Sequence, residues 1–172
     1  MNAEIESKPG AVKNRTTVER KSDREVVVTR TVNGPARIVF EAFTQAELFR
    51  RWWVPESMGM TLLSCEVDAR VGGKYRLVFD VGGTEPVAFF GTYVEVSPHS
   101  RLAWTNEEGG EDGPVTTVTF EETGGKTLVV VHERYPSKEA LDAAGTGAAD
   151  AMHETFDQLD ELLVVLGESS GQ

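Results

Sequence analysis

The stretch that decides the fold is AADAMHETFDQLDELLVVL, residues 148–166. Its large apolar side chains recur at intervals of three or four residues, which is the spacing of one face of an α-helix. They are Met152, Phe156, Leu159, Leu162, Leu163 and Leu166. Acidic residues occupy the other faces, so this helix must bury one stripe against another layer of the domain. Gly167 is expected to end the helix, and residues 168–172 are expected to form a flexible tail.

The other layer is predicted between Met60 and Tyr135, where runs rich in β-branched and aromatic residues alternate with Gly-Gly pairs. The runs are TLLSCEVDA, KYRLVFDV, PVAFFGTYVEV, RLAWTNE, VTTVTFEE and KTLVVVHERY. An earlier run of the same kind, REVVVTRTV, begins at Arg24. No helical segment separates the later runs, so neighbouring strands are antiparallel. The sequence therefore predicts an α+β domain, with a curved antiparallel sheet of about seven strands around the C-terminal helix.

Two short helices are predicted between the first and second strands. Pro35 follows the first strand and is well tolerated in a first helical turn, and the apolar residues of 38–43 follow helical spacing. Residues 44–47 then match the S/T-x-x-E capping pattern, which predicts a second helix that Pro55 ends. This helical corner is expected to close one end of the fold.

Length and composition restrict the function. The 172 residues suit one domain, expected over residues 24–167 after a polar, flexible arm at residues 1–23. The net charge of -11 repels nucleic acid and anionic membrane surfaces, so neither is an expected partner. A single cysteine, Cys65, excludes an internal disulfide, and no apolar run approaches the length of a membrane-spanning helix. The first residues carry no signal-peptide pattern, so a cytoplasmic location is expected.

Alternation within the strands predicts which side chains face the core. Lys74 and Arg76 point to water, which turns the residues of the other parity in that strand inward. Glu95, taken as outward-facing, places Phe90, Val94 and Val96 inside. The later strands are expected to contribute Leu102, Trp104, Val118, Phe120, Leu128, Val130 and His132.

This large, aromatic inner face and the final helix together predict a cavity between them, where a small apolar ligand would bind. The predicted lining residues are Trp53, Pro55, Tyr75, Leu77, Phe79, Phe90, Trp104, Val118, Phe120, His132, Met152 and Phe156. Of the two adjacent tryptophans, Trp52 and Trp53, one is expected to plug the end of the fold or gate the cavity and the other to lie at its rim.

Five motifs occur in an order that is typical of one family. They are RTVNGP at 30–35, RWWVP at 51–55, DARVGG at 68–73, GTYVEVSP at 91–98, and Leu128 with His132. Together they resemble the AHSA1-like (activator of Hsp90 ATPase homologue 1-like) branch of the SRPBCC, or START-like and Bet v 1-like, superfamily. The resemblance covers nearly the whole chain after residue 24.

The resemblance implies a helix-grip fold with a deep apolar cavity between the sheet and the long C-terminal helix. Relatives with this fold bind lipids, polyketides, hormones or other hydrophobic molecules; some are cyclases or hydrolases, and the eukaryotic namesake stimulates the Hsp90 chaperone. Bacterial relatives commonly carry a Gly-Trp pair in the final helix, where this chain has Ala151 and Met152. Methionine is more flexible than tryptophan and adapts more easily to different ligands. The ligand preference of a relative with the Gly-Trp pair therefore cannot be assigned to this chain.

His132 is the one polar residue expected inside the cavity. It is either a core histidine satisfied by a neighbour or a group that orients a ligand or acts as a general base. Arg30 shares the parity of Val28 and Val32, so it is expected to enter the core and pair with a carboxylate such as Asp68. Such a pair is either structural or an anchor for a ligand carboxylate.

Motifs for other chemistry are incomplete. His153, Glu154 and Asp157 spell H-E-x-x-D, one residue away from a zinc-binding pattern, and are expected on a solvated helix face. Residues 144–150 lack the third glycine and the preceding strand of a dinucleotide-binding loop. Cys65 lies in a strand, where a small buried residue is expected rather than a nucleophile. No catalytic residue, metal site or cofactor is predicted.

Three functions remain open from the sequence. The first is a non-enzymatic carrier or sensor of a small apolar molecule, which the aromatic inner face favours. The second is a stress-related or chaperone-associated protein that binds an Hsp90-type partner, which the family resemblance alone favours. The third is an enzyme of the cyclase or hydrolase kind that uses His132.

Overall fold

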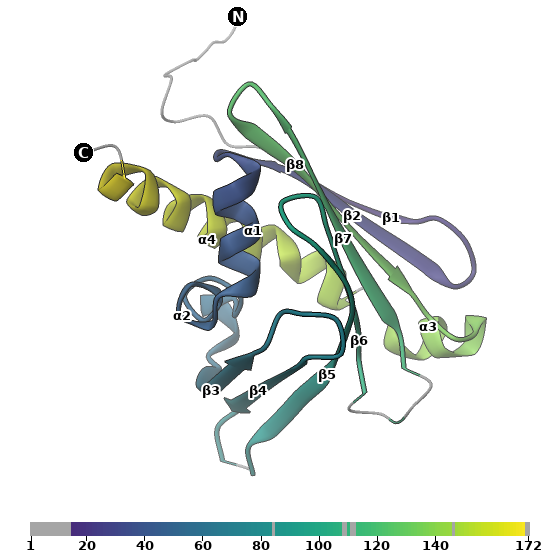
Figure 1. Ribbon diagram of the computed structural model, residues 1–172. Coiled ribbons are helices and arrows are strands. Elements are labelled where there is room, and N and C mark those ends of the chain that lie inside the picture. Colours follow the sequence, from purple (N-terminus) through teal and green to yellow (C-terminus); the bar gives the residue numbers. More distant parts are fainter. Residues whose placement is uncertain (1–14, 84, 108–109, 111–112, 146, 171–172) are drawn as a thin grey trace, which may run out of the picture.

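The computed structural model describes residues 15–83, 85–107, 110, 113–145 and 147–170, and it contains one antiparallel sheet (Figure 1). The strands are β1 (Thr16–Arg20), β2 (Glu25–Val32), β3 (Thr61–Val67), β4 (Lys74–Asp80), β5 (Val87–Ser97), β6 (Arg101–Thr105), β7 (Val115–Thr123) and β8 (Lys126–Arg134). Their order across the sheet is β1-β2-β8-β7-β6-β5-β4-β3. The predicted α+β architecture is therefore confirmed, with eight strands in place of about seven.

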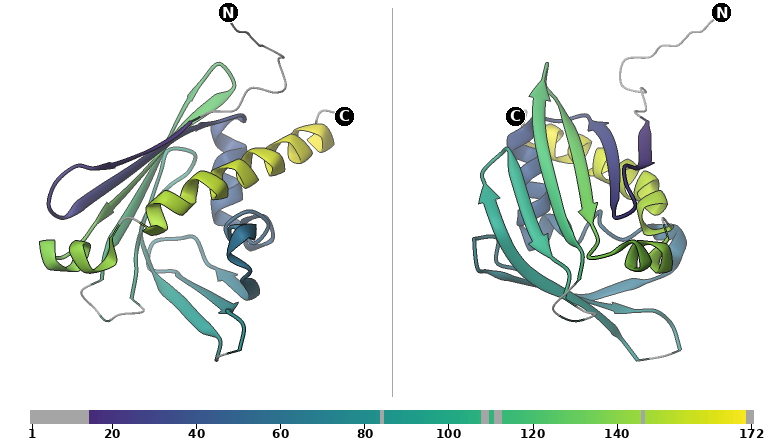
Figure 2. Two further views of the ribbon diagram at one scale, coloured as in Figure 1. Left: turned by 180° about the vertical axis from the view of Figure 1, so that it is seen from behind. Right: turned by 90° about the vertical axis from the view of Figure 1, so that its right-hand side faces the viewer.

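The helices gather on one side of the curved sheet, as the two views of Figure 2 show. They are α1 (Ala36–Thr44), α2 (Ala46–Phe49), the 3-10 helix η3 (Glu56–Met58), α3 (Lys138–Ala144) and α4 (Gly147–Ser170). The long helix α4 packs on β1 and β2, while α1 packs on β7 and β8 and touches α4. This is the helix-grip arrangement. Among the described residues, no helix has the length and apolar character needed to cross a membrane.

The extra strand, β1, lies in the segment that the sequence assigned to a flexible arm. Thr16–Arg20 pairs with β2, with Val18 opposite Val28, and Val18 packs against the core. Its pattern of one half-buried valine between polar residues is too short to stand out as a strand. Residues 1–14, the rest of the expected arm, lie outside the described residues.

Helix α4 is longer at its end than expected. Gly167, predicted to cap it, continues the helix instead, and the backbone stays helical to Ser170. A glycine ends a helix when it adopts a left-handed conformation, and Gly167 does not. Three residues of the expected tail therefore belong to the helix, and residues 171–172 lie outside the described part of the chain.

The core fills the space between the sheet and the helices. The apolar stripe of α4 is buried, with Phe156 and Leu159 fully enclosed. Trp52 is also fully enclosed, and its indole Nε1 donates a hydrogen bond to the Ala42 carbonyl at 2.9 Å. Its ring meets that of Phe43 edge-on, with 4.8 Å between the centroids. Trp52 is thus the plug of the tryptophan pair, because it ties the helical corner to the core.

The predicted alternation is confirmed in β4 but wrong in part of β5. Tyr75, Leu77 and Phe79 are buried, whereas Phe90 and Val94 are exposed. Tyr93 pairs with Trp104 and Glu95 with Ala103, so Val94 is the extra residue of a β-bulge. A bulge shifts the side-chain parity by one residue. Parity read from Glu95 therefore fails for the residues that precede the bulge.

Strand β8 has the opposite parity to the predicted one. Val129 and Val131 are buried in the core, while Leu128, Val130 and His132 lie on the outer face of the sheet. Four consecutive apolar residues, 128–131, leave no charged position to mark the outward face. The inward placement of His132 is therefore wrong.

Arg30 is buried as predicted, but its partners differ. The guanidinium Nη2 lies 2.8 Å from Asp157 Oδ1 and 2.7 Å from Asp160 Oδ2, and Nη1 donates to the Thr16 hydroxyl. Asp68, the suggested partner, instead pairs with Arg70 at 3.0 Å. The arginine therefore clamps β1 and β2 to α4.

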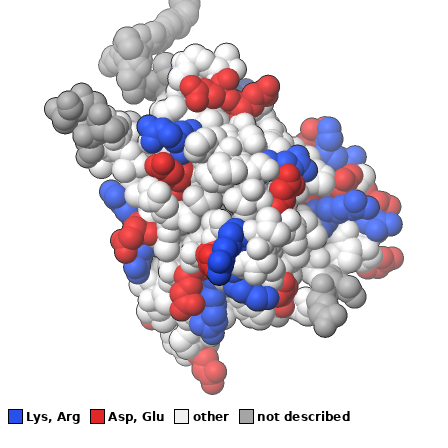
Figure 3. All heavy atoms as spheres, in the orientation of Figure 1, with Lys and Arg blue, Asp and Glu red and all other residues white. Residues whose placement is uncertain are grey.

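Acidic and basic side chains are interspersed on the face drawn in Figure 3, with uncharged surface between them. No continuous basic patch covers this face.

Candidate ligand pocket

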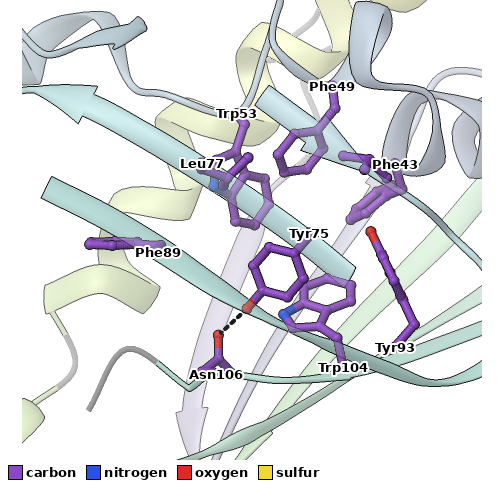
Figure 4. Close-up of a pocket in the computed structure, with 10 residues that line it drawn as sticks. Phe43, Phe49, Trp53, Tyr75, Leu77, Phe89, Tyr93, Trp104 and Asn106 are labelled. Carbon is purple, nitrogen blue, oxygen red and sulfur yellow. Dashed lines mark hydrogen bonds between the residues drawn. The ribbon is translucent and has the colours of Figure 1, made fainter. Parts of the chain in front are cut away.

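An apolar pocket lies between the helical corner and strands β3 to β6, with a volume of about 60 Å³. Figure 4 shows the residues around it, which we call the corner pocket. They are Phe43, Phe49, Trp53, Val67, Tyr75, Leu77, Phe89, Tyr93, Trp104 and Asn106. None of them belongs to α4. The expected cavity between the sheet and the C-terminal helix is therefore displaced toward the helical corner.

Gly91 allows the floor of the corner pocket to form. A Cβ atom at this position would lie 1.8 Å from the Thr105 carbonyl oxygen and 2.8 Å from Cε2 of Tyr75. Both distances are far below van der Waals contact. Only a residue without a side chain lets β5 approach β6 this closely while the Tyr75 ring lies against it.

Helix α4 shapes the corner pocket indirectly, by holding the loop that carries Trp53. The Gln158 amide donates to the carbonyls of Trp52 and Val54, both at 2.8 Å, and its oxygen accepts from the Glu56 amide at 2.9 Å. One side chain thus fixes both sides of Trp53. The Trp53 ring stacks on Phe49, with 4.7 Å between their centroids.

A second contact from α4 holds the next part of this loop. The Glu154 carboxylate accepts hydrogen bonds from the backbone amide and the hydroxyl of Ser57. These bonds lower the pKa of Glu154, the hydroxyl having the larger effect. Glu154 therefore remains ionised in mildly acidic solution.

Two of the polar groups that line the corner pocket are bonded within the protein. The Tyr75 hydroxyl lies 2.8 Å from the Thr105 carbonyl oxygen and 3.2 Å from Asn106 Oδ1. The Asn106 amide nitrogen donates to the Pro114 carbonyl and to the Thr116 hydroxyl, both at 3.0 Å. These bonds fix the turn between β6 and β7 and so have a structural explanation.

The Tyr93 hydroxyl has no such explanation, and neither have the indole N–H groups of Trp53 and Trp104, which form no hydrogen bond among the described residues. Tyr93 is only 4% exposed, yet none of the described residues forms a hydrogen bond with its hydroxyl. Figure 4 shows this hydroxyl pointing toward Phe43, away from the Tyr75 hydroxyl and Asn106. Burial, with smaller effects from Cys65 and Asp68, raises the pKa of Tyr93 well above its ordinary value. The group is therefore a protonated donor without a protein acceptor.

The structure separates the predicted lining residues into three groups. The corner pocket brings together Trp53, Tyr75, Leu77 and Trp104. A second group does not line it: Pro55, Phe79, Val118, Phe120 and Phe156 are buried, and Met152 is partly buried against the core. The third group, Phe90 and His132, lies on the outer face of the sheet.

Sequence reasoning missed six residues of the corner pocket. They are Phe43, Phe49, Val67, Phe89, Tyr93 and Asn106. The first two belong to helices that the sequence did predict. For Phe89 and Tyr93 the available signal was the glycine between them, because an isolated glycine in a strand marks a bulge or a close approach.

His132 takes part in an outer groove with Arg101 and Arg134. Its Nε2 atom lies 2.9 Å from Glu25 Oε2. Hydrogen bonds from Ser22 and then from His132 lower the pKa of Glu25. Because His132 faces away from the corner pocket, it cannot act as a base on a ligand bound there.

Two of the three H-E-x-x-D residues are less solvated than expected. His153 is exposed, but Glu154 holds Ser57 and Asp157 binds Arg30. Within the described ranges no cluster of His, Cys, Asp and Glu could hold a metal ion. Burial raises the pKa of the Cys65 thiol, which disfavours the nucleophilic thiolate.

Comparison with known proteins supports the resemblance seen in the sequence. The family model described as activator of Hsp90 ATPase homolog 1-like protein matches residues 33–164. No curated protein matches the chain. Among solved structures, one from Rhodobacter sphaeroides is 21% identical, with a TM-score of 0.79, and covers 88% of this chain and 99% of its own.

Two further solved structures are more similar in sequence. A protein from Staphylococcus epidermidis is 28% identical, with a TM-score of 0.70, and the match covers 86% of this chain and 93% of that one. A protein from Chromobacterium violaceum is also 28% identical, with a TM-score of 0.65, and the match covers 80% and 96%. These likenesses establish the fold over most of the described residues.

Proposed function

Because the chain belongs to the activator of Hsp90 ATPase homolog 1-like family, we propose that it binds a small apolar molecule in the corner pocket, as a carrier or a sensor. The observation that carries this proposal is the lining itself. Nine of its ten residues are aromatic or aliphatic, and none is charged. Such a wall favours an uncharged, apolar occupant over a polar metabolite.

The size of the corner pocket sets a condition on binding. Its volume of about 60 Å³ is less than half of the roughly 150 Å³ that holds benzene in a closed apolar cavity. A ligand with one or two rings therefore needs side chains to move. Phe89, which is 42% exposed, and the partly buried ring of Trp53, whose backbone Gln158 holds, are the lining side chains placed to do so.

Two adjacent phenylalanines offer a matched test of this site. Phe89 lines the corner pocket, whereas Phe90 lies on the opposite face of the sheet with a similar exposure of 38%. The experiment titrates the aspartate variant of each residue with N-phenyl-1-naphthylamine, an uncharged probe whose fluorescence rises in apolar surroundings. We expect saturable binding by the wild type and by Phe90→Asp, and binding weaker by about tenfold or more for Phe89→Asp, because a carboxylate would have no counter-ion in the apolar lining.

Either of two results would remove the proposal. One is the absence of saturable binding by the wild-type protein. The other is an equal loss in the two variants, which would place the probe outside the corner pocket. Circular dichroism spectra of the variants establish that each remains folded.

A chaperone-associated role, for instance in a stress response, is the second candidate, and the family description is the observation that favours it. Capture of purified bacterial Hsp90 by the immobilised chain tests it. Binding in a fixed stoichiometry at micromolar concentration would support this role, and no retention would end it. The hydrolase-like alternative depended on His132 inside the cavity, and its outer position removes that basis.

A further inference from the structure

The Tyr93 hydroxyl is a hydrogen-bond donor that the protein itself leaves unused. Although Tyr93 is 4% exposed, its hydroxyl oxygen is not fully enclosed, since among the described residues Arg30 Nε is the one fully enclosed side-chain polar atom without a hydrogen bond. The neighbouring Tyr75 shows that this site can satisfy a tyrosine, because its hydroxyl has the Thr105 carbonyl at 2.8 Å. Most polar groups in protein interiors are paired, and phenylalanine would fill the place of Tyr93 without a hydroxyl to satisfy. The hydroxyl is therefore explained best by an acceptor that arrives with a ligand.

We propose that the ligand of the corner pocket is a neutral aromatic molecule with one hydrogen-bond acceptor, a carbonyl or ether oxygen, which the Tyr93 hydroxyl binds. This inference rests on the proposed function, since it names the chemical class of the molecule that the pocket takes. The Tyr93 hydroxyl sets the orientation of the ligand, and the rings around it supply the contact area.

The aromatic side chains that line the corner pocket favour an aromatic ligand. Phe43, Phe49, Trp53 and Trp104 surround the site, and their flat faces and edges pack best against another flat ring. Phe49 and Trp53 are already stacked with 27° between their planes. A planar ligand can extend this stack when Trp53 moves.

The charges near Tyr93 favour a ligand whose hydrogen-bond acceptor is neutral. No lysine or arginine lines the corner pocket, so a carboxylate or phosphate would have no counter-ion there. Asp68 lies near enough to oppose ionisation of Tyr93, and the chain carries a net charge of -11. The hydroxyl stays protonated and donates, so its partner must accept.

The test compares two probes that differ in one group. 2-Acetylnaphthalene carries a ketone oxygen, and 2-ethylnaphthalene has nearly the same shape without it. Dissociation constants are measured for the wild type, Tyr93→Phe and Tyr135→Phe. Tyr135→Phe is the matched control, because it removes the hydroxyl of a tyrosine that does not line the corner pocket.

We expect the wild type to prefer the ketone, and Tyr93→Phe to bind it about three- to tenfold more weakly, the range of one neutral hydrogen bond. The same variant should bind 2-ethylnaphthalene as well as the wild type does. Tyr135→Phe should keep the preference for the ketone. With a ¹³C-labelled carbonyl, the ketone resonance of the wild-type complex should lie downfield of the resonance of the Tyr93→Phe complex.

Two failures are distinguishable. If both probes bind the wild type and Tyr93→Phe with unchanged affinities, the Tyr93 hydroxyl is satisfied by water, and this inference is wrong while the proposed function stands. If neither probe binds the wild type, the proposed function fails, and the inference that depends on it fails too.

Discussion

The rings of Tyr75 and Tyr93 lie 5.9 Å apart in the same pocket, and only the first has an acceptor for its hydroxyl among the described residues. The two residues come from neighbouring strands, β4 and β5, and both are buried. Both rings therefore pack in the core, and the two residues differ in whether their hydroxyl groups are hydrogen-bonded.

This difference predicts different effects on stability. Tyr75→Phe should lower the free energy of unfolding by about 1 kcal/mol, because it removes the hydrogen bond to the Thr105 carbonyl. Tyr93→Phe should leave the free energy of unfolding nearly unchanged, because its hydroxyl has no hydrogen bond within the described residues to lose. Urea titration followed by tryptophan fluorescence measures both, and a larger loss for Tyr93→Phe than for Tyr75→Phe would contradict the assignment.

The Arg30 clamp predicts a large loss when it is broken. Arg30→Ala leaves two carboxylates, Asp157 and Asp160, facing an empty buried site, so the free energy of unfolding should fall by about 3 kcal/mol. Lys138→Ala is the matched control, since its pair with Asp142 has the same 2.7 Å separation as the Asp160 pair but is exposed. That control should change stability by less than about 0.5 kcal/mol. Equal effects of the two substitutions would show that Arg30 is not clamped as described.

Gly91 predicts a steric effect at the floor of the corner pocket. Gly91→Ala places a methyl group against the Thr105 carbonyl oxygen, so β5 must move away from β6 and the free energy of unfolding should fall by at least 2 kcal/mol, roughly the upper part of the overpacking range. Gly167→Ala is the control, because a Cβ atom there would have no atom within 4 Å beyond its own stretch of helix. It should be neutral or slightly stabilising. A loss at Gly167 similar to the loss at Gly91 would favour the capping role first expected for Gly167.

The bonds between Glu154 and Ser57 predict that acid loosens the loop that follows Trp53. The pKa of Glu154 is lowered in the folded protein by the Ser57 hydroxyl and amide. A lowered pKa means that the stabilising contact is complete above about 4.3, the pKa of a free glutamate, and is lost as the pH falls through the lower pKa of Glu154. Between pH 6 and pH 3, exchange of the Ser57 amide hydrogen, corrected for its intrinsic rate, should therefore become faster. Glu154→Gln should remove this pH dependence, and a dependence that persists in the variant would assign it to another group.

The sequence identifies the fold because its strongest patterns have few alternatives. The stripe of α4 has one helical interpretation, and in β4 charged residues at 74 and 76 fix the parity of Tyr75 and Leu77. The parity of β7 is likewise confirmed by the burial of Val118 and Phe120. Where polar and apolar residues alternate cleanly, burial follows directly from the order of the residues.

The errors arise where the pattern is interrupted or uniform. The bulge at Val94 shifts the parity of β5, which moves Phe90 out of the core and places Tyr93 inside. The uniform run of 128–131 hides the parity of β8, so the sequence assigns His132 to the wrong face. The carboxylates that bind Arg30 come from α4, 127 and 130 residues further along the chain. Only the folded topology brings such partners together.

The most direct test of the central claim is an isotope-filtered nuclear Overhauser experiment on the labelled wild-type protein with bound N-phenyl-1-naphthylamine. Binding in the corner pocket predicts contacts from the probe to Phe89, Tyr93 and Trp53, which line it. Contacts to Met152 on α4 or to Phe90 and His132 on the outer face of the sheet, without contacts to Phe89 and Tyr93, would contradict it.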